Sequence, residues 1–454
     1  MELIIIGAGP GGFAAAMYGA KRGLQITLID KAELGGTCLN RGCIPTKAIL
    51  HCANTFHQAK GFADLGINVA IEGIDYNKIS KRRNQIVTRL KISVEKQLKR
   101  AGVTIIHGEA RLAGDNQVKV VANGEEKILT ADKIILATGA VPTEISGIVI
   151  DGEVVINSDH ALALDQLPDS IVIIGGGVIG CEFAQAFARL GCEVSIIELM
   201  PRLLPGVDSD ASTILQKTLA YDGVKIYLGA SVTSVKKDAT NAVVTVQTTE
   251  GEKEIITRKV LIAVGRKPIL DRLGLDVAGV NHENGFIMVD EQMRTNQNDI
   301  YAIGDVTAGI QLAHVASFGG VVAVKDMLGE EAGMADIAVP MCVYTEPEIV
   351  SVGLTLEAAK ERGLNYRIAA FPLSANSRAI ISGELDGFAK MIIDEDGTIL
   401  GACLVGGNVS EMISLLGGLI NFQTNVEDMK EIMFAHPSIS EIISESIAAT
   451  PPCI

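Results

Sequence analysis

Short apolar runs followed by glycine-rich turns recur along the first two thirds of the chain. The stretch LIIIGAGPGG spans residues 3–12, and the stretch IVIIGGGVIG spans residues 171–180. Each apolar run has the length of a buried strand, and each turn leads into a segment rich in small residues that we expect to be helical. The chain therefore contains a repeated strand, turn and helix, whose two copies start 168 residues apart.

An acidic residue ends the next predicted strand in both copies. Asp30 follows QITLI and Glu198 follows EVSII, each 18 residues beyond the last glycine of its turn. In a nucleotide-binding βαβ unit the three glycines of G-x-G-x-x-G allow a tight turn, the approach of a pyrophosphate and close helix packing. The acid accepts hydrogen bonds from the ribose. Two copies in matching register therefore predict two dinucleotide-binding units. Their glycines are Gly7, Gly9, Gly12, Gly175, Gly177 and Gly180.

The pattern changes along the rest of the chain. Residues 74–101 carry apolar positions at helical spacing among many lysines and arginines, which predicts a long exposed helix. Short alternating strands are expected within residues 103–136, and the stretches ADKIILATG and KVLIAVGRKP close the two units with further strands. From about residue 340 strands are followed by helices, which indicates an α+β domain. Its strands are expected near residues 342–352, 366–371, 388–394 and 400–405, with helical segments from residue 408 onward.

Composition and charge exclude several classes of protein. With 454 residues, 48% of them hydrophobic and 20% charged, the chain is expected to form about three soluble domains, and no apolar run is long enough to span a membrane. The net charge of −15 would repel phosphate backbones, so nucleic acid is not expected as a partner. Strand-like sequence begins at the second residue, which favours a chain without a targeting segment and a cytoplasmic location.

Two cysteines, Cys38 and Cys43, lie close together in the stretch GGTCLNRGCIPTK of residues 35–47. Their spacing differs from the C-x-x-C of common zinc sites, and no second pair of cysteines or histidines accompanies them nearby, so no metal is expected. A structural disulfide across so short a loop would restrict the unfolded chain little, and a reducing cytosol opposes it. The interpretation that remains is a redox-active dithiol, in which one thiolate attacks and the other thiol resolves the mixed disulfide.

These motifs together resemble a known family. The cysteine stretch, the two glycine turns, ATG at residues 137–139, IYAIGDV at 300–306 and FAHPSISE at 434–441 are similar to those of the flavin-dependent pyridine nucleotide-disulfide oxidoreductases and, within them, the dihydrolipoyl dehydrogenases. The resemblance covers essentially the whole chain. It implies an α/β fold of two Rossmann-like dinucleotide-binding domains plus a C-terminal α+β dimerisation domain. The implied boundaries are 1–145 for the first part of the FAD-binding domain, 146–266 for the NAD-binding domain, 267–337 for the central part that returns to the FAD-binding domain, and 338–454 for the interface domain.

The resemblance also implies two cofactors, FAD and NAD. The first unit, with Asp30, is similar to the FAD site, and Asp305 is similar to the residue that binds the flavin ribityl chain. The second unit, with Glu198, resembles the pyridine-nucleotide site, where a carboxylate accepts from a free 2′-hydroxyl and repels a 2′-phosphate. NAD is therefore favoured over NADP. The remaining cofactor-binding residues implied by the resemblance are Thr138, Gly139, Gly265, Gly304 and Ala313.

Four catalytic residues are implied near the dithiol and the flavin. Cys43 resembles the flavin-facing thiolate that forms a charge-transfer complex, and Cys38 resembles the interchange thiol that reacts with substrate sulfur. Lys47 matches the lysine beside flavin N5, and Glu182 matches its paired glutamate. Arg41 departs from the family, because an apolar residue commonly stands between the cysteines, and its charge is expected to tune the thiolate.

Two further catalytic residues are implied near the C-terminus. His436 resembles the base that takes the proton of the substrate thiol, and Glu441 resembles the carboxylate that orients it. The implied activity is NAD-dependent oxidation of dihydrolipoamide on a lipoyl domain or H-protein, by a homodimer within a 2-oxo acid dehydrogenase or glycine cleavage assembly. An NAD(P)H-dependent reductase of another small disulfide, similar to glutathione reductase, stays open as the alternative. Cys453 is a single cysteine near the end and has no assigned role.

Overall fold

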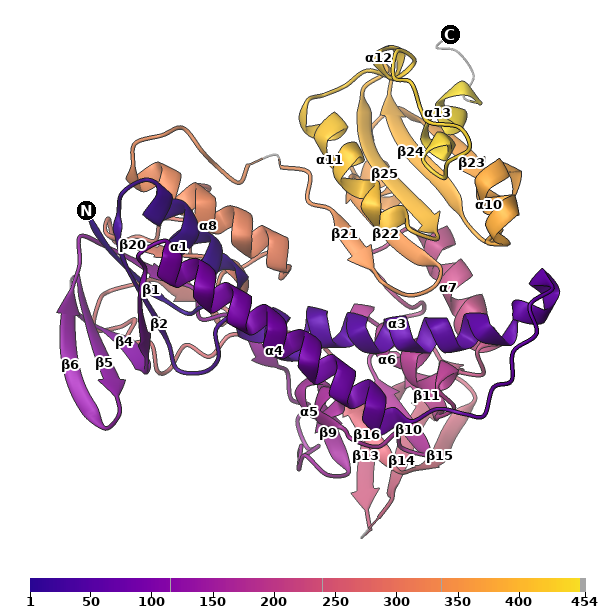
Figure 1. Ribbon diagram of the computed structural model, residues 1–454, viewed down its shortest axis with the longest axis horizontal. Helices are drawn as coiled ribbons and strands as arrows, with labels where there is room; N and C mark the ends of the chain where they lie inside the picture. The colour runs from indigo at the N-terminus through magenta and orange to yellow at the C-terminus, as the bar shows by residue number, and fades with distance from the viewer. Residues whose placement is uncertain (115, 239, 336, 450–454) are drawn as a thin grey trace.

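Five parallel strands form a sheet that contains the N-terminus and lies at the left of Figure 1. The computed structural model describes residues 1–449 except 115, 239 and 336, so Cys453 lies outside the described residues. The strand order is β20-β7-β1-β2-β3, which places β20, the last of the five along the chain, at an edge beside β7. The strands are β1 (Glu2–Ile6), β2 (Gln25–Asp30), β3 (Thr104–His107), β7 (Lys133–Leu136) and β20 (Ile300–Ala302).

Both faces of this first sheet are covered, which explains the unbroken apolar runs in its strands. Leu3 and Ile5 of β1 pack in one core cluster with residues of α1 (Pro10–Lys21) and α8 (Ala313–Met327). The alternate positions of β1 pack in another cluster with the three-stranded antiparallel sheet β4-β5-β6. These strands are β4 (Glu109–Gly114), β5 (Gln117–Ala122) and β6 (Glu125–Thr130).

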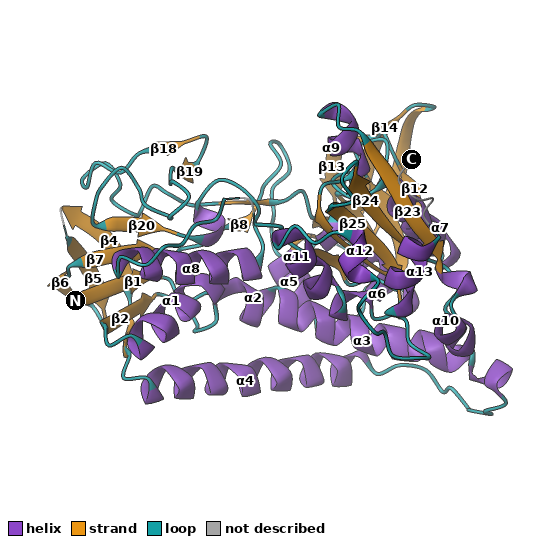
Figure 2. Ribbon diagram, turned by 90° about the horizontal axis from the view of Figure 1, so that it is seen from above, coloured by secondary structure: helices purple, strands orange, loops and turns teal. Residues whose placement is uncertain are grey.

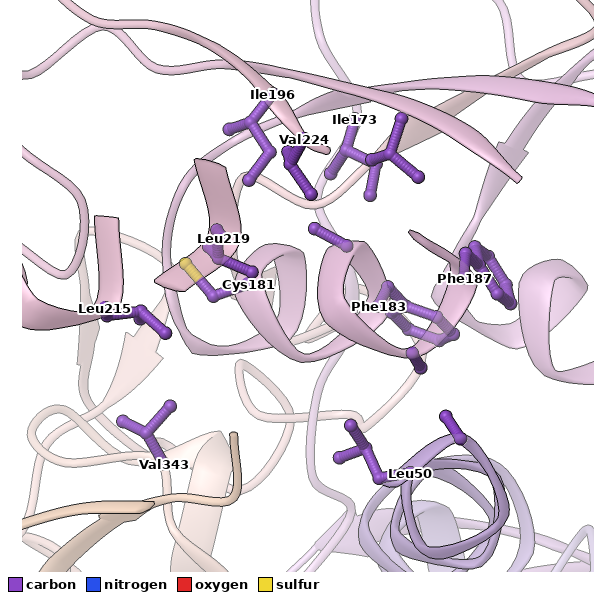
Figure 3. Packing of buried hydrophobic residues seen from close by; sticks show 14 of the residues in the cluster. Leu50, Ile173, Cys181, Phe183, Phe187, Ile196, Leu215, Leu219, Val224 and Val343 are labelled. Carbon is purple, nitrogen blue, oxygen red and sulfur yellow. The ribbon is translucent and has the colours of Figure 1, made fainter. Parts of the chain in front are cut away.

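The second glycine turn lies in a sheet built on the same plan. Its five parallel strands have the order β12-β11-β10-β16-β9. On one face Phe183 and Phe187 of α6 (Val178–Arg189) pack in a cluster with Ile173 of β10, as Figure 3 shows. The antiparallel sheet β13-β14-β15 covers the other face. The strands are β9 (Val155–Asn157), β10 (Ser170–Ile174), β11 (Glu193–Ile197), β12 (Lys225–Tyr227), β13 (Ser231–Lys237), β14 (Ala242–Thr248), β15 (Gly251–Thr257) and β16 (Lys259–Ile262).

A five-stranded antiparallel sheet of order β21-β22-β25-β24-β23 forms the third domain. One of its core clusters includes residues of α11 and α13, whereas Val343, Ile349 and Val405 belong to the cluster around α6. The third domain therefore packs directly on the second unit. Its elements are β21 (Met341–Val343), β22 (Glu348–Gly353), β23 (Tyr366–Pro372), β24 (Phe388–Asp394), β25 (Ile399–Gly406), α9 (Leu356–Glu361), α10 (Ser377–Ser382), α11 (Ile413–Asn421), α12 (Val426–Met429) and α13 (Glu441–Ala448).

Long helices run along one side of the molecule and connect its parts. Figure 2 shows α4 (Tyr76–Arg100) beneath α1 and α3 (Cys43–Lys60), and α3 passes from the first sheet to the second unit. Asp75 caps α4 by accepting from the backbone N–H of Lys78 at 3.1 Å. The remaining helices and strands are α2 (Gly36–Arg41), α5 (Ser158–Ala163), α7 (Ser209–Tyr221), β8 (Val141–Pro142), β17 (Arg266–Lys267), β18 (His282–Glu283) and β19 (Phe286–Ile287).

Most elements expected from the sequence are present. The predicted helix over residues 74–101 is α4, both repeated units have their strand, turn and helix, and the C-terminal domain is α+β. Residues 342–352 are divided into β21 and β22, because the segment around Pro347 turns the chain between two antiparallel strands. Among the described residues no helix is both long and apolar enough to cross a membrane.

Candidate active site

The two cysteines lie at adjoining helix ends. Cys38 lies in α2, and Cys43 is the first residue of α3. At Gly42 between them, a Cβ would lie 3.0 Å from the carbonyl oxygen of Thr37 and 3.2 Å from the Cα of Cys38. A larger residue would press on α2, so glycine allows α3 to begin close beside it. Both cysteines are partly exposed free thiols in this structure.

The two thiols differ in acidity because they share a hydrogen bond. The bond from Cys38, opposed by burial and helped by the charge of Lys47, lowers the pKa of Cys43 to about 7. The same bond and burial raise the pKa of Cys38, which keeps its proton. Lys47 lies one turn beyond Cys43 on the same face of α3, and the helix N-terminus also favours a negative charge. Of the two sulfurs, Cys43 is therefore the one that loses its proton near pH 7, while Cys38 stays a thiol.

A buried carboxylate holds Lys47 in place. Glu182 of α6 is 3% exposed, and its two oxygens accept from Nζ of Lys47 at 2.8 and 2.7 Å. The carboxylate also accepts from the backbone N–H of Tyr344 at 3.0 Å. The ring of Tyr344 lies 4.6 Å from the same Nζ, within the range of a cation–π contact. This cluster joins the first unit, the second unit and the third domain beside Cys43.

The first glycine turn leaves room for a ligand on one side only. Gly7 has φ +109°, and a Cβ there would lie 2.1 Å from the carbonyl oxygen of Ala137. A Cβ at Gly12 would lie 1.9 Å from the carbonyl oxygen of Gly7, so α1 packs tightly on β1. The nearest atom to a Cβ at Gly9 would be 4.0 Å away, and no side chain caps the start of α1. The helix N-terminus is thus available to a pyrophosphate.

The second glycine turn has the same geometry. Gly175 has φ +111°, and a Cβ there would lie 2.5 Å from the carbonyl oxygen of Ala263. A Cβ at Gly180 would lie 1.9 Å from the carbonyl oxygen of Gly175, whereas a Cβ at Gly177 would meet nothing within 4 Å. No side chain caps α6, which begins directly after Gly177. Both units are therefore built to receive a dinucleotide.

The acids at the strand ends are fixed by backbone N–H groups. Asp30 accepts from the N–H of Ala8 at 2.6 Å, and Glu198 accepts from the N–H of Gly176, the matching position, at 2.5 Å. The second oxygen of Glu198 accepts from the N–H of Met200 at 2.7 Å, and the residue is 8% exposed. Each carboxylate is held beside its glycine turn, where such an acid binds a ribose.

Several buried polar groups near the first unit fit a bound FAD. Within the described residues, Nε of Arg266 and Oδ1 of Asn40 are buried without a hydrogen-bond partner. Burial lowers the pKa of Arg266, and burial raises the pKa of the Asp305 carboxyl, which the charge of Arg266 opposes. A flavin nucleotide carries ring nitrogens and oxygens, ribityl hydroxyls and a pyrophosphate, which supply partners for both donors and acceptors.

The other predicted cofactor residues lie beyond the carboxyl ends of strands. Thr138 and Gly139 follow β7, Gly265 follows β16, and Gly304 with Asp305 follows β20. This is the edge of a parallel sheet at which ligands bind. The last of the set, Ala313, begins α8.

His436 and Glu441 form a pair in the third domain. Nδ1 of His436 lies 2.9 Å from Oε1 of Glu441, and the other carboxylate oxygen accepts from the N–H of Ser438 at 2.8 Å. These two hydrogen bonds lower the pKa of the Glu441 carboxyl. Because a carboxylate only accepts, a neutral His436 ring carries its proton on Nδ1, which leaves a lone pair on Nε2. The His436 side chain is 73% exposed, and within the described part of the chain its ring pairs with Glu441 rather than with either cysteine.

Three residues near the dithiol could not be identified from the sequence. Arg266 lies in the two-residue strand β17 and Tyr344 in the loop after β21, so no periodic pattern marks either residue. Asp159 of α5 lies 3.9 Å from Nε of Arg41. The cation that lowers the pKa of Cys43 is Lys47, while Arg41 joins the cysteine helix to the second unit.

Comparisons with known proteins agree over the whole chain. Residues 1–320 match the family described as pyridine nucleotide-disulphide oxidoreductase, and residues 339–447 match the dimerisation domain of the same family. A dihydrolipoyl dehydrogenase of Bacillus subtilis is 37% identical over 99% of this chain and 98% of its own length. One from Chlorobaculum parvum is 38% identical over 99% of this chain and 96% of its own length.

Solved structures share the same fold. LpdA from Mycobacterium tuberculosis superposes with a TM-score of 0.93 at 28% identity, covering 99% of both chains. The HOCl-induced flavoprotein disulfide reductase RclA from Escherichia coli superposes with a TM-score of 0.87 at 29% identity, covering 99% of this chain and all of the other. The α/β fold with a C-terminal dimerisation domain, expected from the sequence, is therefore confirmed.

Proposed function

The chain belongs to the pyridine nucleotide-disulphide oxidoreductase family, and on that premise we propose that it oxidises protein-bound dihydrolipoamide with NAD, through Cys38, Cys43 and a bound FAD. The observation that carries the proposal is the unequal pair of thiols beside the Lys47–Glu182 ion pair. Disulfide exchange needs one sulfur that leaves as a stable thiolate and another that stays available to substrate. The low pKa of Cys43 suits it to leave as the thiolate, and the raised pKa of Cys38 keeps it as the thiol that reacts with substrate.

In the oxidised enzyme the two cysteines form a disulfide that the substrate opens. One thiolate of dihydrolipoamide attacks the sulfur of Cys38, and Cys43 leaves as a thiolate. The second substrate thiol then attacks the mixed disulfide, which closes the lipoamide ring and releases Cys38 with a proton. Two electrons have moved from substrate to the cysteines. A bound FAD would pass these electrons on to NAD, giving NADH and one released proton.

The base in this exchange is His436, acting on the active site of the partner subunit. The family match includes a dimerisation domain over residues 339–447, so the chain forms homodimers through the domain that carries His436. Its exposed ring, oriented by Glu441, has a lone pair on Nε2 to take the proton of the substrate thiol. Since the His436–Glu441 pair contacts neither cysteine of its own chain, a second copy supplies the natural partner.

The remaining assignments follow from the two nucleotide units. The first unit binds FAD and the second binds NAD, because the buried Glu198 carboxylate would face a 2′-phosphate with an uncompensated negative charge. The protein partner is a lipoyl domain or H-protein, within a 2-oxo acid dehydrogenase or glycine cleavage assembly. We keep the proposed boundaries of the four segments: 1–145, 146–266, 267–337 and 338–454.

Steady-state turnover tests the proposal. The purified enzyme is given dihydrolipoamide with NAD in one series and glutathione disulfide with NADH in another. We expect a kcat/KM for dihydrolipoamide far above that for glutathione disulfide, and loss of both activities in Cys43→Ser. The opposite ranking would support a reductase of another small disulfide and contradict the proposed substrate.

A further inference from the structure

A ladder of hydrogen-bonded polar side chains extends from the Lys47–Glu182 pair along the contact between α3 and α6, with its α6 members buried and its α3 members partly or fully exposed. Side chains at spacings of seven and four residues on α3, and of three and four on α6, lie on one face of each helix. Glu346, from the third domain, lies between Gln58 of α3 and Arg189 of α6 and binds both side chains. The ladder consists of Lys47, Asn54 and Gln58 of α3, Glu182, Gln185 and Arg189 of α6, and Glu346.

Arg189 forms the outer end of the ladder and binds three separate segments. Its side chain is 3% exposed, and its Nε donates to Asp222, 1% exposed, at 2.9 Å. One terminal nitrogen donates to Oδ1 of Asn54 at 2.9 Å and to the carboxylate of Glu346. The other lies 3.3 Å from the backbone oxygen of Glu346. The guanidinium thus ties α6 to α3, to the end of α7 and to the third domain.

The middle of the ladder holds the chain between Tyr344 and Glu346. Gln185 is fully buried; its amide donates to the carbonyl of Glu346 at 2.8 Å and accepts from the N–H of Glu346 at 2.7 Å. Gln58 donates to the Glu346 carboxylate at 2.8 Å from the α3 side. The N–H of Tyr344 donates to Glu182, and its ring lies against Nζ of Lys47, so both residues of the ion pair contact this segment.

α6 has little freedom to move except through these contacts. Figure 3 shows it enclosed, with Ile173 and Ile196 on one side and Leu50 and Val343 on the other. Its first turn belongs to the second glycine motif, and its second turn carries Glu182. Arg189 and Glu182 lie seven residues apart on the same side of this enclosed helix, so both ends of the ladder belong to one rigid element.

We propose that Arg189 is a positioning residue for the redox centre: by locking α6 to α3 and to the Tyr344–Glu346 segment, it fixes the Lys47–Glu182 pair against Cys43 and so sets the thiolate of the dithiol. Buried ion pairs are weak sources of stability, since desolvation offsets most of their attraction. A guanidinium that makes four hydrogen bonds to three residues in three segments is better explained by the geometry it imposes.

Charged groups surround both Cys43 and Arg189, and those near Cys43 affect the titration of its thiol. Cys43 is faced by Cys38 of α2, Lys47 of its own helix, Glu182 of α6 and Arg266 of β17. Around Arg189 are Asp222 and Glu346, with Nδ1 of His57 at 3.8 Å from Asp222. Burial and the charge of Arg189 lower the pKa of His57, which leaves the ring neutral near pH 7.

The test is the pH titration of the long-wavelength absorbance of the Cys43 thiolate in the reduced holoenzyme. In Arg189→Gln we expect the apparent pKa of Cys43 to rise by about one unit, because Lys47 no longer lies fixed beside it, and the thiolate fraction at pH 7 to fall about fivefold. Arg189→Lys, which keeps the charge and part of the bonding, should recover part of the shift. An unchanged titration in a folded Arg189→Gln enzyme overturns the proposal.

A second variant and a matched control complete the experiment. Asn54→Ala removes one contact of Arg189 from the α3 side and should shift the titration in the same direction by less. Arg294→Gln removes a guanidinium paired with Asp326 in the first unit, at 2.7 and 2.5 Å, and should leave the titration unchanged. If Arg189→Gln does not fold, Arg189→Lys and Asn54→Ala decide, and no shift in both contradicts the proposal.

The inference rests on the proposed roles of Cys43 and Lys47, but its readout does not require dihydrolipoamide. If the enzyme turns over another disulfide, the proposed substrate fails while the thiolate titration still tests Arg189. If turnover of dihydrolipoamide is as proposed and the titration is unchanged, Arg189 serves the fold alone.

Discussion

The sulfur atoms of Cys38 and Cys43 share one hydrogen bond, and that bond is the largest cause of the low pKa of Cys43. Cys38→Ala removes the donor, so we expect the pKa of Cys43 to rise from about 7 toward the ordinary range of a thiol. Cys38→Ser keeps a hydroxyl donor and should raise it less. Because the thiolate is the deprotonated form, the higher pKa lowers alkylation of Cys43 at pH 7. The rate of alkylation against pH, with peptide mapping, checks this order, and equal rates in both variants would contradict it.

A second residue-scale prediction concerns the choice of nucleotide. The Glu198 carboxylate is buried and held by two N–H donors, so it cannot turn away from a 2′-phosphate. Glu198→Gln removes the repulsion, and we expect the ratio of kcat/KM for NAD over NADP to fall by about tenfold or more. Glu193→Gln is the control: Glu193 lies at the start of β11, forms an exposed pair with Lys225 of β12, and its loss should leave the ratio unchanged. A ratio near one in the unmutated enzyme would refute the assignment.

Residues within contiguous motifs could be located from the sequence, and residues brought in by folding could not. Local spacing along the chain identifies the glycines, the two acids and the cysteines, because a turn or a helix start needs such residues within a short stretch. Arg266 and Tyr344 approach the dithiol only after separate domains pack together. Their positions depend on tertiary contacts across more than two hundred residues, which a local pattern does not contain.

At the scale of elements, the two glycine turns should fail in different ways. Gly12→Ala puts a Cβ 1.9 Å from the backbone of Gly7 and should abolish flavin binding, because α1 can no longer pack on β1. Gly180→Ala makes the same clash with Gly175 and should leave the enzyme yellow while NADH no longer reduces it. Gly61→Ala is the control, since its nearest contact would be 3.6 Å away. Flavin absorbance and its bleaching by NADH distinguish the three. Loss of flavin in Gly180→Ala alone would reverse the assignment of the units.

Long or repeated elements were predictable, and short connecting ones were not. α4 carries its own apolar spacing and an Asp75 cap, and the repeated strands carry runs of Ile and Val buried on both faces. The small helix α2 has no such signal, since none of its six residues is buried. It forms because Gly35 and Gly42 let the chain enter and leave sharply beside the first turn.

At the scale of the whole molecule, each active site should need two chains. Cys38→Ser homodimers lack the exchanging thiol and His436→Gln homodimers lack the base, so both should lose most activity, by about 10²-fold or more for the base. In a mixed dimer one site carries both lesions and the other carries neither. A purified heterodimer should therefore regain about half of the unmutated activity, by the symmetry of a two-fold interface.

The control for this experiment is a heterodimer in which both chains carry a substitution in their own cysteine pair. Cys38→Ser paired with Cys43→Ser leaves one damaged cysteine pair in each site, so it should stay inactive. If the Cys38→Ser and His436→Gln mixture also stays inactive, the base serves its own chain, and the cross-subunit assignment is wrong.

The position of β20 has a consequence for the nascent chain. The first sheet begins with β1 at residue 2 but closes its edge only when residues 300–302 pair with β7. The second unit, from β9 to β16, lies wholly within residues 155–262. On the ribosome the middle of this protein can therefore complete its sheet before the beginning does. Until β20 emerges, the edge of β7 stays open to pairing with wrong strands, so we expect the first unit rather than the second to be the part at risk of aggregation during translation.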